Sequence, residues 1–475
     1  MSNARPSPGL TPLSEEYAGA DLGDVRLSKR LQRIVCGLEA DPAQSFPKAA
    51  GSDSELEATY RLLRNDAVTP EAIIAPHYAM TCERASQYDT VLAVHDTTEF
   101  RFSGETRREG LGRLGQKGQG FFAHVSLCVA PDETRLPLGV VNVETLFRLA
   151  KARGKRSHRA LREDPNNESK RWSRGVDGAE DRVAGRASLV HLMDREGDAY
   201  ELVAHMVQDK RRFIVRSAHD RVVMQMGSDG RTRSRISDAA AGTADVALRD
   251  VPLSRRGAPR TPSMRKLHPP REYRVARLAF RAVAVVLARP CQLPSTLPAS
   301  LRVNVVLVRE VDPPPGQPEV CWTLLTSEPV QNADDILRIV DWYRARWTIE
   351  EYFKALKLGC AYEARQLETR RTLLNALSIL LPIAWRLLTL RNLARSDGDR
   401  LATTVLPRAQ VDVLVATSKG RLPPTPTVRQ AMLDIARRGG HIKANGEPGW
   451  QVLGRGYHDL LLLELGWVAG RNSIL

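Results

Sequence analysis

The segment from Tyr343 to Lys357, YRARWTIEEYFKALK, carries the most specific pattern in this 475-residue chain. Tyr343, Arg346, Glu350, Lys354 and Lys357 are spaced by three or four residues. Side chains with this spacing line one face of a helix. We therefore expect one helix over about 336–358 whose face presents an aromatic hydroxyl, cations and a carboxylate.

The apolar surface of this expected helix is supplied by Trp347, Ile349, Phe353 and Leu356. We expect these residues to pack against a sheet. The helix alone also allows a second interpretation, a surface helix stabilised by a Glu350–Lys354 salt bridge.

Two aspartates follow apolar runs that predict buried strands. Asp96 comes after the run 91–94, and Asp194 comes after the run 189–193. We expect both carboxylates at strand ends, where ligands commonly bind in α/β proteins. An aspartate in the position of Asp96 is, taken alone, more often a turn or cap residue.

Two aspartates and a glutamate suit magnesium, which prefers hard oxygen ligands. Two such ions about 3.5–4 Å apart activate a nucleophile and stabilise the leaving oxygen in phosphodiester chemistry. The chain has no P-loop, no G-x-S-x-G and no H-E-x-x-H motif that would indicate a rival site.

The N-terminal part combines helical periodicity with basic residues. Leu22, Leu27, Leu31 and Ile34 recur at helix spacing among arginines and lysines, and a second helix is predicted over 55–64, closed by Asn65. Arg26, Arg30 and Arg61 are the candidate DNA contacts. Two ordinary solvated helices would show the same pattern.

The middle of the chain predicts short strands at 91–94, 121–130 and 138–143, followed by a long charged loop over 151–185. A helix over 198–208 and a strand over 212–216 come next. Residues 217–318 predict a β-rich insertion that contains a basic loop, 251–271. After a strand at 320–325, the chain from about 334 is mainly helical.

Composition favours a polyanionic partner. The chain has 70 Lys+Arg and 55 Asp+Glu, a net charge of 70 − 55 = +15. A soluble protein that is merely basic is the alternative. The six cysteines form no C-x-x-C pair, which predicts reduced and mostly buried thiols. The strongest apolar run, 376–385, contains Pro382 and stops at Arg386, so we expect a cytoplasmic protein with no membrane span.

Together these residues resemble the bacterial insertion-sequence DDE transposases with the Y-R-E-K signature, typified by the transposon-five transposase. Tyr343, Arg346, Glu350 and Lys357 match every place of Y-x2-R-x3-E-x6-K. The resemblance extends to Asp96-Thr97-Thr98, to Asp194-Arg195-Glu196, and to the 324–329 stretch preceded by Trp322. In the first helix the family's paired arginines become Arg26-Leu27, so the recognised DNA end should differ.

The resemblance implies an α/β fold with a ribonuclease-H-like catalytic core. The implied domains are a helical end-binding domain over 1–70, a catalytic domain over 71–370 with its β-rich insertion at 217–318, and a helical dimerisation domain over 371–475. The implied activity is cut-and-paste transposition through nicking, hairpin formation and strand transfer. The expected partners are the inverted-repeat ends, target DNA and a second copy of the chain. We expect a bacterial cytoplasmic enzyme that is nucleoid-associated when bound to DNA.

The resemblance also assigns roles to single residues. Asp96, Asp194 and Glu350 would hold two Mg²⁺ ions, with Mn²⁺ able to substitute. The residues that would bind the DNA end and a flipped base are Tyr343, Arg346, Lys354, Lys357, Arg216 and Trp322. Trp322 could instead be a core residue of its strand.

Two other functions fit parts of the pattern. One is a DNA-binding regulator that has lost catalysis, and the other is a stand-alone ribonuclease-H-like nuclease. Joining of a labelled DNA end to a second DNA would distinguish a transposase from either.

Overall fold

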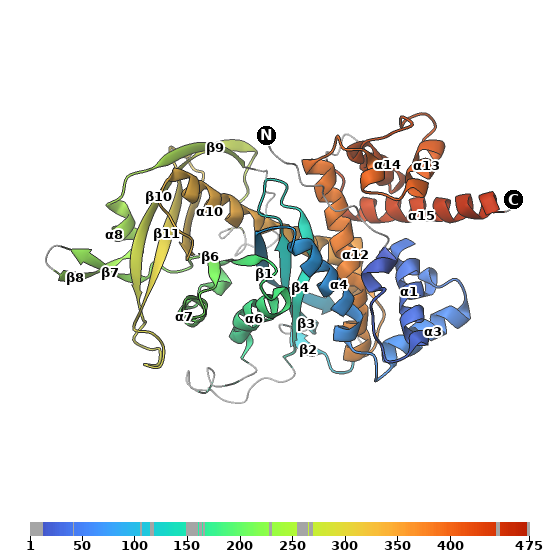
Figure 1. Cartoon of the computed structure of the whole chain (residues 1–475), viewed down its shortest axis with the longest axis horizontal. Coiled ribbons are helices and arrows are strands. Elements are labelled where there is room, and N and C mark those ends of the chain that lie inside the picture. The colour runs from blue at the N-terminus through green and yellow to red at the C-terminus, as the bar shows by residue number, and fades with distance from the viewer. Residues whose placement is uncertain are drawn as a thin grey trace. The chain divides into compact units, whose positions relative to one another are not determined.

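A computed structural model of the chain describes residues 13–472 apart from 41, 105–106, 115–117, 149–159, 161–163, 165–166, 228–229, 254–264, 266–268 and 443–446. It is an α/β structure with both parallel and antiparallel strands, as expected (Figure 1). The chain divides into two compact units. The first contains Met1–Ser188 and Trp347–Leu475, and the second contains Leu189–Arg346.

The sheet of the first unit is antiparallel. β3 (Gly118–Val129) pairs with β1 (Thr90–Phe102), β2 (Gly112–Leu114) and β4 (Pro137–Leu146). The three longer strands confirm those predicted from the sequence; β1 and β4 are longer than predicted at both ends, and β3 begins three residues earlier and ends one residue earlier. β1 is longest because buried residues continue to alternate with more exposed ones as far as Phe102.

Helices make up the rest of the first unit. The N-terminal helices are η1 (Leu13–Tyr17), α1 (Val25–Ala40), α2 (Phe46–Ala49), α3 (Asp53–Arg64) and α4 (Pro70–Ala85). The C-terminal helices are α11 (Trp347–Lys354), η4 (Ala355–Gly359), η5 (Tyr362–Ala364), α12 (Arg370–Ser396), η6 (Ala402–Thr404), α13 (Arg408–Thr417), α14 (Val428–Arg438) and α15 (Trp450–Asn472). The predicted end of α3 at Asn65 and the helical C-terminal part are confirmed.

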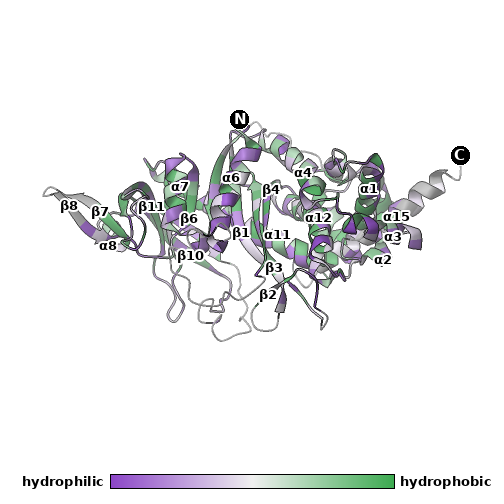
Figure 2. Cartoon of the chain, turned by 90° about the horizontal axis from the view of Figure 1, so that it is seen from below, coloured by the Kyte–Doolittle hydropathy of each residue, from purple (hydrophilic) through white to green (hydrophobic). Residues whose placement is uncertain are grey.

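α12 is the central helix of the first unit and packs against α3, α4 and β4 (Figure 2). Pro382 and Arg386 both lie within α12, which continues through them to Ser396. α12 is long and apolar enough to cross a membrane, yet 89% of its most apolar window is buried inside the protein. This burial is typical of the core helix of a folded unit.

The predicted loop over 151–185 is wrong at its C-terminal end. Glu168–Lys170 form η2, and Arg171–Val183 form α6. Trp172, Val176, Ala179 and Val183 are all buried, and their spacing places them on one helix face. Gly175 and Gly178 obscure this period in the sequence, but both glycines allow close packing of the helix. Most of residues 149–166 lie outside the described part of the chain.

The second unit is built on strands that continue into the β-rich segment. β5 (Ser188–Met193) pairs in parallel with β6 (Arg212–Arg216), and β6 pairs with β12 (Cys321–Thr326). β12 continues antiparallel to β11 (Ser300–Glu310) and then β10 (Arg274–Ala288). The insertion strands thus belong to the same sheet as β6.

The remaining elements complete the second unit. β7 (Val222–Gly227) and β9 (Ala247–Leu253) pair with β10, and β8 (Gly230–Arg235) pairs with β7. The helices are η3 (Arg195–Gly197), α7 (Tyr200–Gln208), α8 (Ile236–Ala241) and α10 (Ala333–Ala345). Most of the predicted basic loop over 251–271 lies outside the described residues.

The predicted single helix over 336–358 is wrong. α10 ends at Ala345, α11 begins at Trp347, and Ala355–Gly359 form a π-helical turn. The break coincides with the boundary between the two units. The four signature residues and Lys354 therefore do not form one continuous helix face.

The cysteines are less buried than expected. Cys82, Cys128 and Cys360 are buried, whereas Cys36, Cys291 and Cys321 are exposed. None of the six cysteines forms a disulfide, which agrees with the reduced state that the sequence predicted.

Candidate functional site

Asp96 lies inside β1 and not at its end, which corrects the sequence expectation. It is opposite Val125 of β3, and β1 continues for six residues beyond it. The Thr97 amide donates a hydrogen bond of 2.7 Å to Asp96 Oδ1. Asp96 is half-buried, so its carboxylate is held by the sheet and remains accessible.

Glu350 lies in the first turn of α11, and this helix packs against β1 in the same unit. Ile349 and Phe353 are buried, and Glu350 in the same turn of the helix is half-buried. Trp347 does not join the apolar surface as predicted, because it is 55% exposed. As the first residue of α11, it lies at the break between the helices.

The two lysines of this helical segment, Lys354 and Lys357, have different surroundings. Lys354 is exposed, and its ammonium lies 2.6 Å from Glu351 Oε1. Lys357 is half-buried and donates a 2.6 Å hydrogen bond to the carbonyl oxygen of Glu99 on β1. Burial lowers the pKa of Lys357, although Glu363 and Glu99 oppose this shift. Lys357 thus connects the C-terminal end of this helical segment to β1.

Asp194 directly follows β5 in the second unit, as predicted. It is half-buried and caps η3, accepting a 2.8 Å hydrogen bond from the Glu196 amide. The structure thus adds a helix-capping role to the strand-end position that the sequence predicted for Asp194.

A cluster around Tyr343 gathers further signature residues in the second unit. The Tyr343 ring lies edge-on to Trp322, with 5.8 Å between the ring centroids. Burial raises the pKa of Tyr343, and nearby Asp194 adds to this shift, whereas Arg346 and Arg216 oppose it. Trp322 itself is only half-buried, so it is not a simple core residue of β12.

Arg216 is the most constrained cation of this cluster. Burial lowers its pKa, and a hydrogen bond with the Tyr343 side chain partly offsets that shift. Its guanidinium also lies 3.4 Å from the Cys321 carbonyl oxygen. Asp194, Arg216, Tyr343 and Arg346 therefore form one charged group in this unit.

The candidate N-terminal DNA contacts lie on α1 and α3. The Arg26 side chain is 91% exposed and pairs with Asp24, and Arg61 is exposed and pairs with Glu57. Such surface pairs contribute at most about 1 kcal/mol, so both arginines can exchange their partners for phosphates. Arg30 is half-buried beside Glu55 in a small surface pocket.

Residues 12–68 match the family model described as transposase DNA-binding. The match covers η1 to α3 and includes all three of these arginines. It supports a transposase or DNA-binding role for the chain and DNA as its partner.

The transposase DNA-binding region is anchored to the rest of the first unit by buried polar contacts. The Tyr17 hydroxyl donates to the Ile379 carbonyl at 2.5 Å, and the Asn375 amide donates to the carbonyls of Leu63 and Val68. Arg365 donates to the Pro42 carbonyl at 2.6 Å. The region is therefore part of the folded unit rather than a tethered module.

Glu16 provides the strongest of these anchors. Its carboxylate lies 2.5 Å from Arg84 Nη1 and 2.7 Å from His77 Nδ1. Burial alone would raise the pKa of Glu16, but His77 and Arg84 outweigh burial and lower it to about 2. No sequence motif indicated this contact between η1 and α4.

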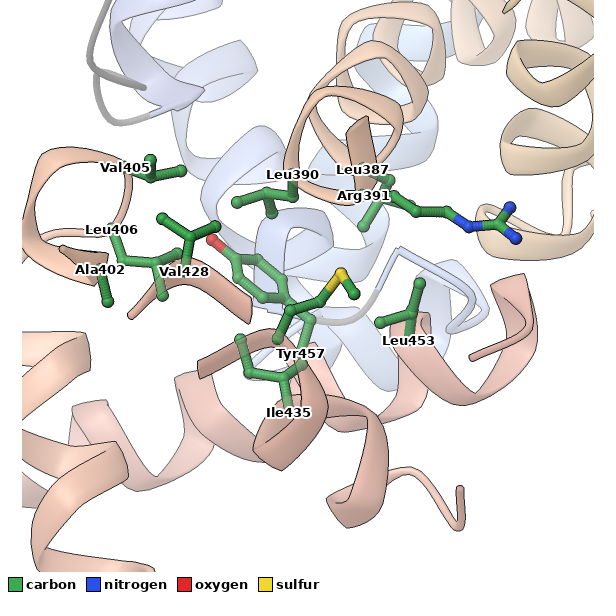
Figure 3. Close-up of a pocket in the computed structure, with 11 residues that line it drawn as sticks. Leu387, Leu390, Arg391, Ala402, Val405, Leu406, Val428, Ile435, Leu453 and Tyr457 are labelled. Carbon is green, nitrogen blue, oxygen red and sulfur yellow. The ribbon is translucent and has the colours of Figure 1, made fainter. Parts of the chain in front are cut away.

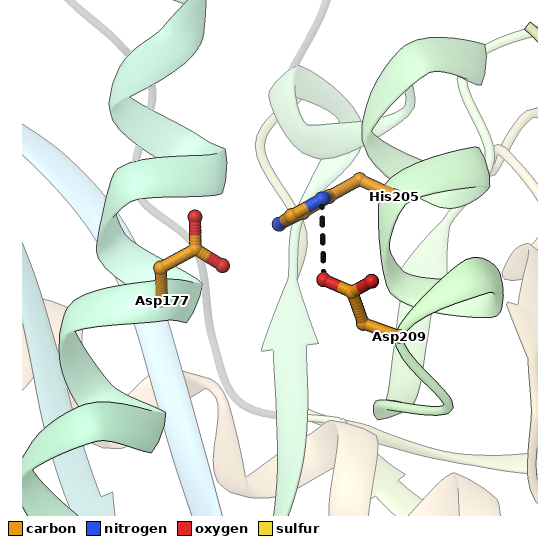
Figure 4. A group of neighbouring side chains, drawn as sticks. All are labelled: Asp177, His205 and Asp209. Atoms are coloured by element: carbon orange, nitrogen blue, oxygen red, sulfur yellow. Dashed lines mark ion pairs between the residues drawn. The ribbon is translucent and has the colours of Figure 1, made fainter.

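Two other features were not found from the sequence. A small apolar cavity of about 30 Å³ lies among α12, η6, α14 and α15, lined by residues such as Leu387, Ile435 and Tyr457 (Figure 3). It has room for one water and reflects packing rather than ligand binding. On α7, His205 Nδ1 lies 3.5 Å from Asp209 Oδ2, a local pair at the helix end (Figure 4).

Proposed function

We propose that this protein is a DDE transposase that cuts its own DNA ends and joins them to a target. The observation that carries the proposal is the transposase DNA-binding match, which lies in the same unit as Asp96 and Glu350. The Y-x2-R-x3-E-x6-K signature supports the finer assignment to the insertion-sequence family. The ribonuclease-H-like identity of the α/β core rests on that same resemblance.

Asp96, Asp194 and Glu350 are the proposed ligands of two Mg²⁺ ions. These three residues suit Mg²⁺, because each supplies hard carboxylate oxygens and each is half-buried rather than enclosed. Bound magnesium would supply the activation of a water or 3′ hydroxyl and the charge stabilisation of the leaving oxygen. The combination of ligands from both units rests on the signature.

The protein's own residues position the DNA. Tyr343, Arg346 and Arg216 offer a hydroxyl and two guanidinium groups beside Asp194, which suits phosphate oxygens and a displaced base. Trp322 presents a half-buried indole against Tyr343, and we propose that this indole occupies the position that a flipped base leaves. Lys354 and Lys357 would contact the end from α11 and η4.

The test replaces each carboxylate by its amide. Asp96→Asn, Asp194→Asn and Glu350→Gln should each abolish nicking of a labelled inverted-repeat end in Mg²⁺ or Mn²⁺, because an amide is a poor ligand for either ion. Glu351→Gln is the matched control on α11, and it should still cut. DNA binding in a gel-shift assay should survive in all four variants.

The outcomes separate the competing functions. A wild-type protein that binds its ends but never cuts them would favour the DNA-binding regulator. Cutting without joining to a second DNA would favour a nuclease. Near-normal cutting by any one amide variant would remove that residue from the ligand set.

A further inference from the structure

A wide groove of about 890 Å³ lies in the first unit, beyond the candidate ligand positions. It is bounded by the end of β1, the β2–β3 hairpin and the segment that carries Lys357. The volume is within the range of about 300–1,000 Å³ that encloses small ligands, so it can hold a short stretch of one nucleic-acid strand. None of the functional patterns in the sequence indicated this groove.

The groove combines an apolar floor with a basic rim. Phe102, Leu111 and Leu114 line it and are almost fully buried. Its charged lining residues are Arg101, Arg107, Arg113, Lys357, Glu99 and Glu363. This gives four cations against two carboxylates.

The two carboxylates already have partners. Glu99 Oε1 lies 2.7 Å from Arg101 Nη2, and Glu363 Oε1 accepts a 2.7 Å hydrogen bond from the Arg101 backbone amide. Arg107 and Arg113 are exposed, and neither side chain forms a hydrogen bond or ion pair with a residue that the structure describes. Their charges are thus available to an anionic ligand.

The groove begins close to the proposed ligands of the same unit. Phe102, a groove residue on the same face of β1 as Asp96, is six residues from it, or about 20 Å along the strand. Lys357 is seven residues beyond Glu350, which corresponds to about 10 Å along a helix. A DNA strand cut near Asp96 and Glu350 would reach this groove within a few nucleotides.

We infer that the groove binds the single DNA strand that flanks the cut, with Arg107 and Arg113 contacting its phosphates. The inference rests on the proposed function for the position of the cut. Cations along a groove follow the phosphodiester backbone of one strand without reading its base sequence. The groove therefore holds a strand that has left the duplex.

The test measures binding of a fluorescent 20-nucleotide oligothymidylate by anisotropy in EDTA at several salt concentrations. Arg107/Arg113→Ala should weaken binding between about tenfold and about a hundredfold, because a hydrogen bond to a charged group is worth about tenfold. Loss of two phosphate contacts should also reduce the salt slope by about 1.4. Arg107/Arg113→Lys should keep most of that slope.

The matched control is Arg186/Lys419→Ala, which removes the same charge from exposed positions of the first unit outside the groove. It should change affinity and slope much less. Equal losses in the two alanine variants would overturn the inference, since they would show a general charge effect. An unchanged affinity of Arg107/Arg113→Ala would overturn it as well.

A second measurement locates the strand directly. A photoreactive amino acid incorporated in place of Arg113 should crosslink to the oligothymidylate, whereas the same amino acid in place of Lys419 should not. Crosslinking at both positions or at neither would contradict the inference. Neither measurement needs cleavage, so a protein that binds the strand here and never cuts DNA would contradict the proposed function and leave this inference standing.

Discussion

Single residues in this protein owe their properties to neighbours that are distant in the sequence. Glu16 and Arg84 are 68 residues apart and form a buried ion pair, and Trp322 meets Tyr343 across two elements. Burial strengthens such contacts and makes their loss costly, because the remaining partner stays desolvated. Two predictions follow from these pairs.

Replacing Glu16 should destabilise the protein and change its response to acid. The Glu16 pKa falls from 4.5 to about 2 on folding, which corresponds to about 3 kcal/mol of stability at neutral pH. That stability is fully present above about pH 4.5 and is lost as the pH falls towards 2. Calorimetric melting of Glu16→Gln should show a lower melting temperature at pH 7 and a smaller further loss between pH 4.5 and 3.

Exposed Glu15 provides the control for that measurement. Glu15→Gln should melt like the wild type throughout the same pH range. A Glu16→Gln variant that matched the wild type at pH 7 would show that the buried ion pair contributes no net stability.

Replacing Trp322 should separate two steps of the proposed reaction. Nicking needs the metal ligands and a water, whereas a hairpin needs the strand to turn and a base to leave the stack, at a cost of a few kcal/mol. Trp322→Ala should therefore accumulate nicked DNA with little hairpin on a strand-resolved gel. Trp322→Phe keeps a ring against Tyr343 and should retain more hairpin. Equal slowing of both steps would indicate that Trp322 only supports β12.

At the scale of elements, the position of α6 depends on how closely its backbone approaches β3. A Cβ atom on Gly175 would come within 2.8 Å of His124 Nε2 and 2.9 Å of His124 Cδ2 on β3. His124 is fully buried, and burial lowers its pKa to about 3, so a neutral imidazole lies against the helix. The glycine that weakens the helical pattern is therefore what allows the helix to pack.

Gly175→Ala should destabilise the protein although alanine is the better helix former. The added methyl group must displace a buried ring, and overpacking of a core typically costs about 1–3 kcal/mol. Gly466 in α15 has open space around it, so Gly466→Ala should instead stabilise its helix by up to about 1 kcal/mol. Thermal melting of both variants gives the comparison, and a stabilised Gly175→Ala would show that β3 and α6 adjust without cost.

At the scale of the whole molecule, DNA recognition and the fold of the first unit are not separable. The transposase DNA-binding region supplies partners to Arg84, Arg365 and Asn375 in the interior of that unit. Removing the region would take away these buried hydrogen bonds and would expose the faces of α4 and α12 that η1 and α3 cover.

A chain that lacks residues 1–68 should therefore fail to fold its first unit, as measured by circular dichroism and protease resistance. Recognition of the DNA end is better tested with Arg26/Arg30/Arg61→Ala. This variant removes charges from the surfaces of α1 and α3 and keeps the buried polar contacts that anchor the region. This variant should lose preference for its own end while it retains salt-sensitive binding to random duplex. A truncated chain that melts like the wild type would contradict the first expectation, and an unchanged end preference would contradict the second.

The sequence by itself determined the features that depend on local pattern. Apolar periodicity predicted β3, β4, β5, β6 and α3, and the Lys and Arg excess indicated the polyanionic partner that the transposase DNA-binding match supports. The tertiary structure decided the rest. It extended β1 past Asp96, separated α10 from α11, and placed α6 where a loop was expected. The physical reason is that pairing with β3 and packing against His124 are long-range contacts, and their free energy overrides local preference.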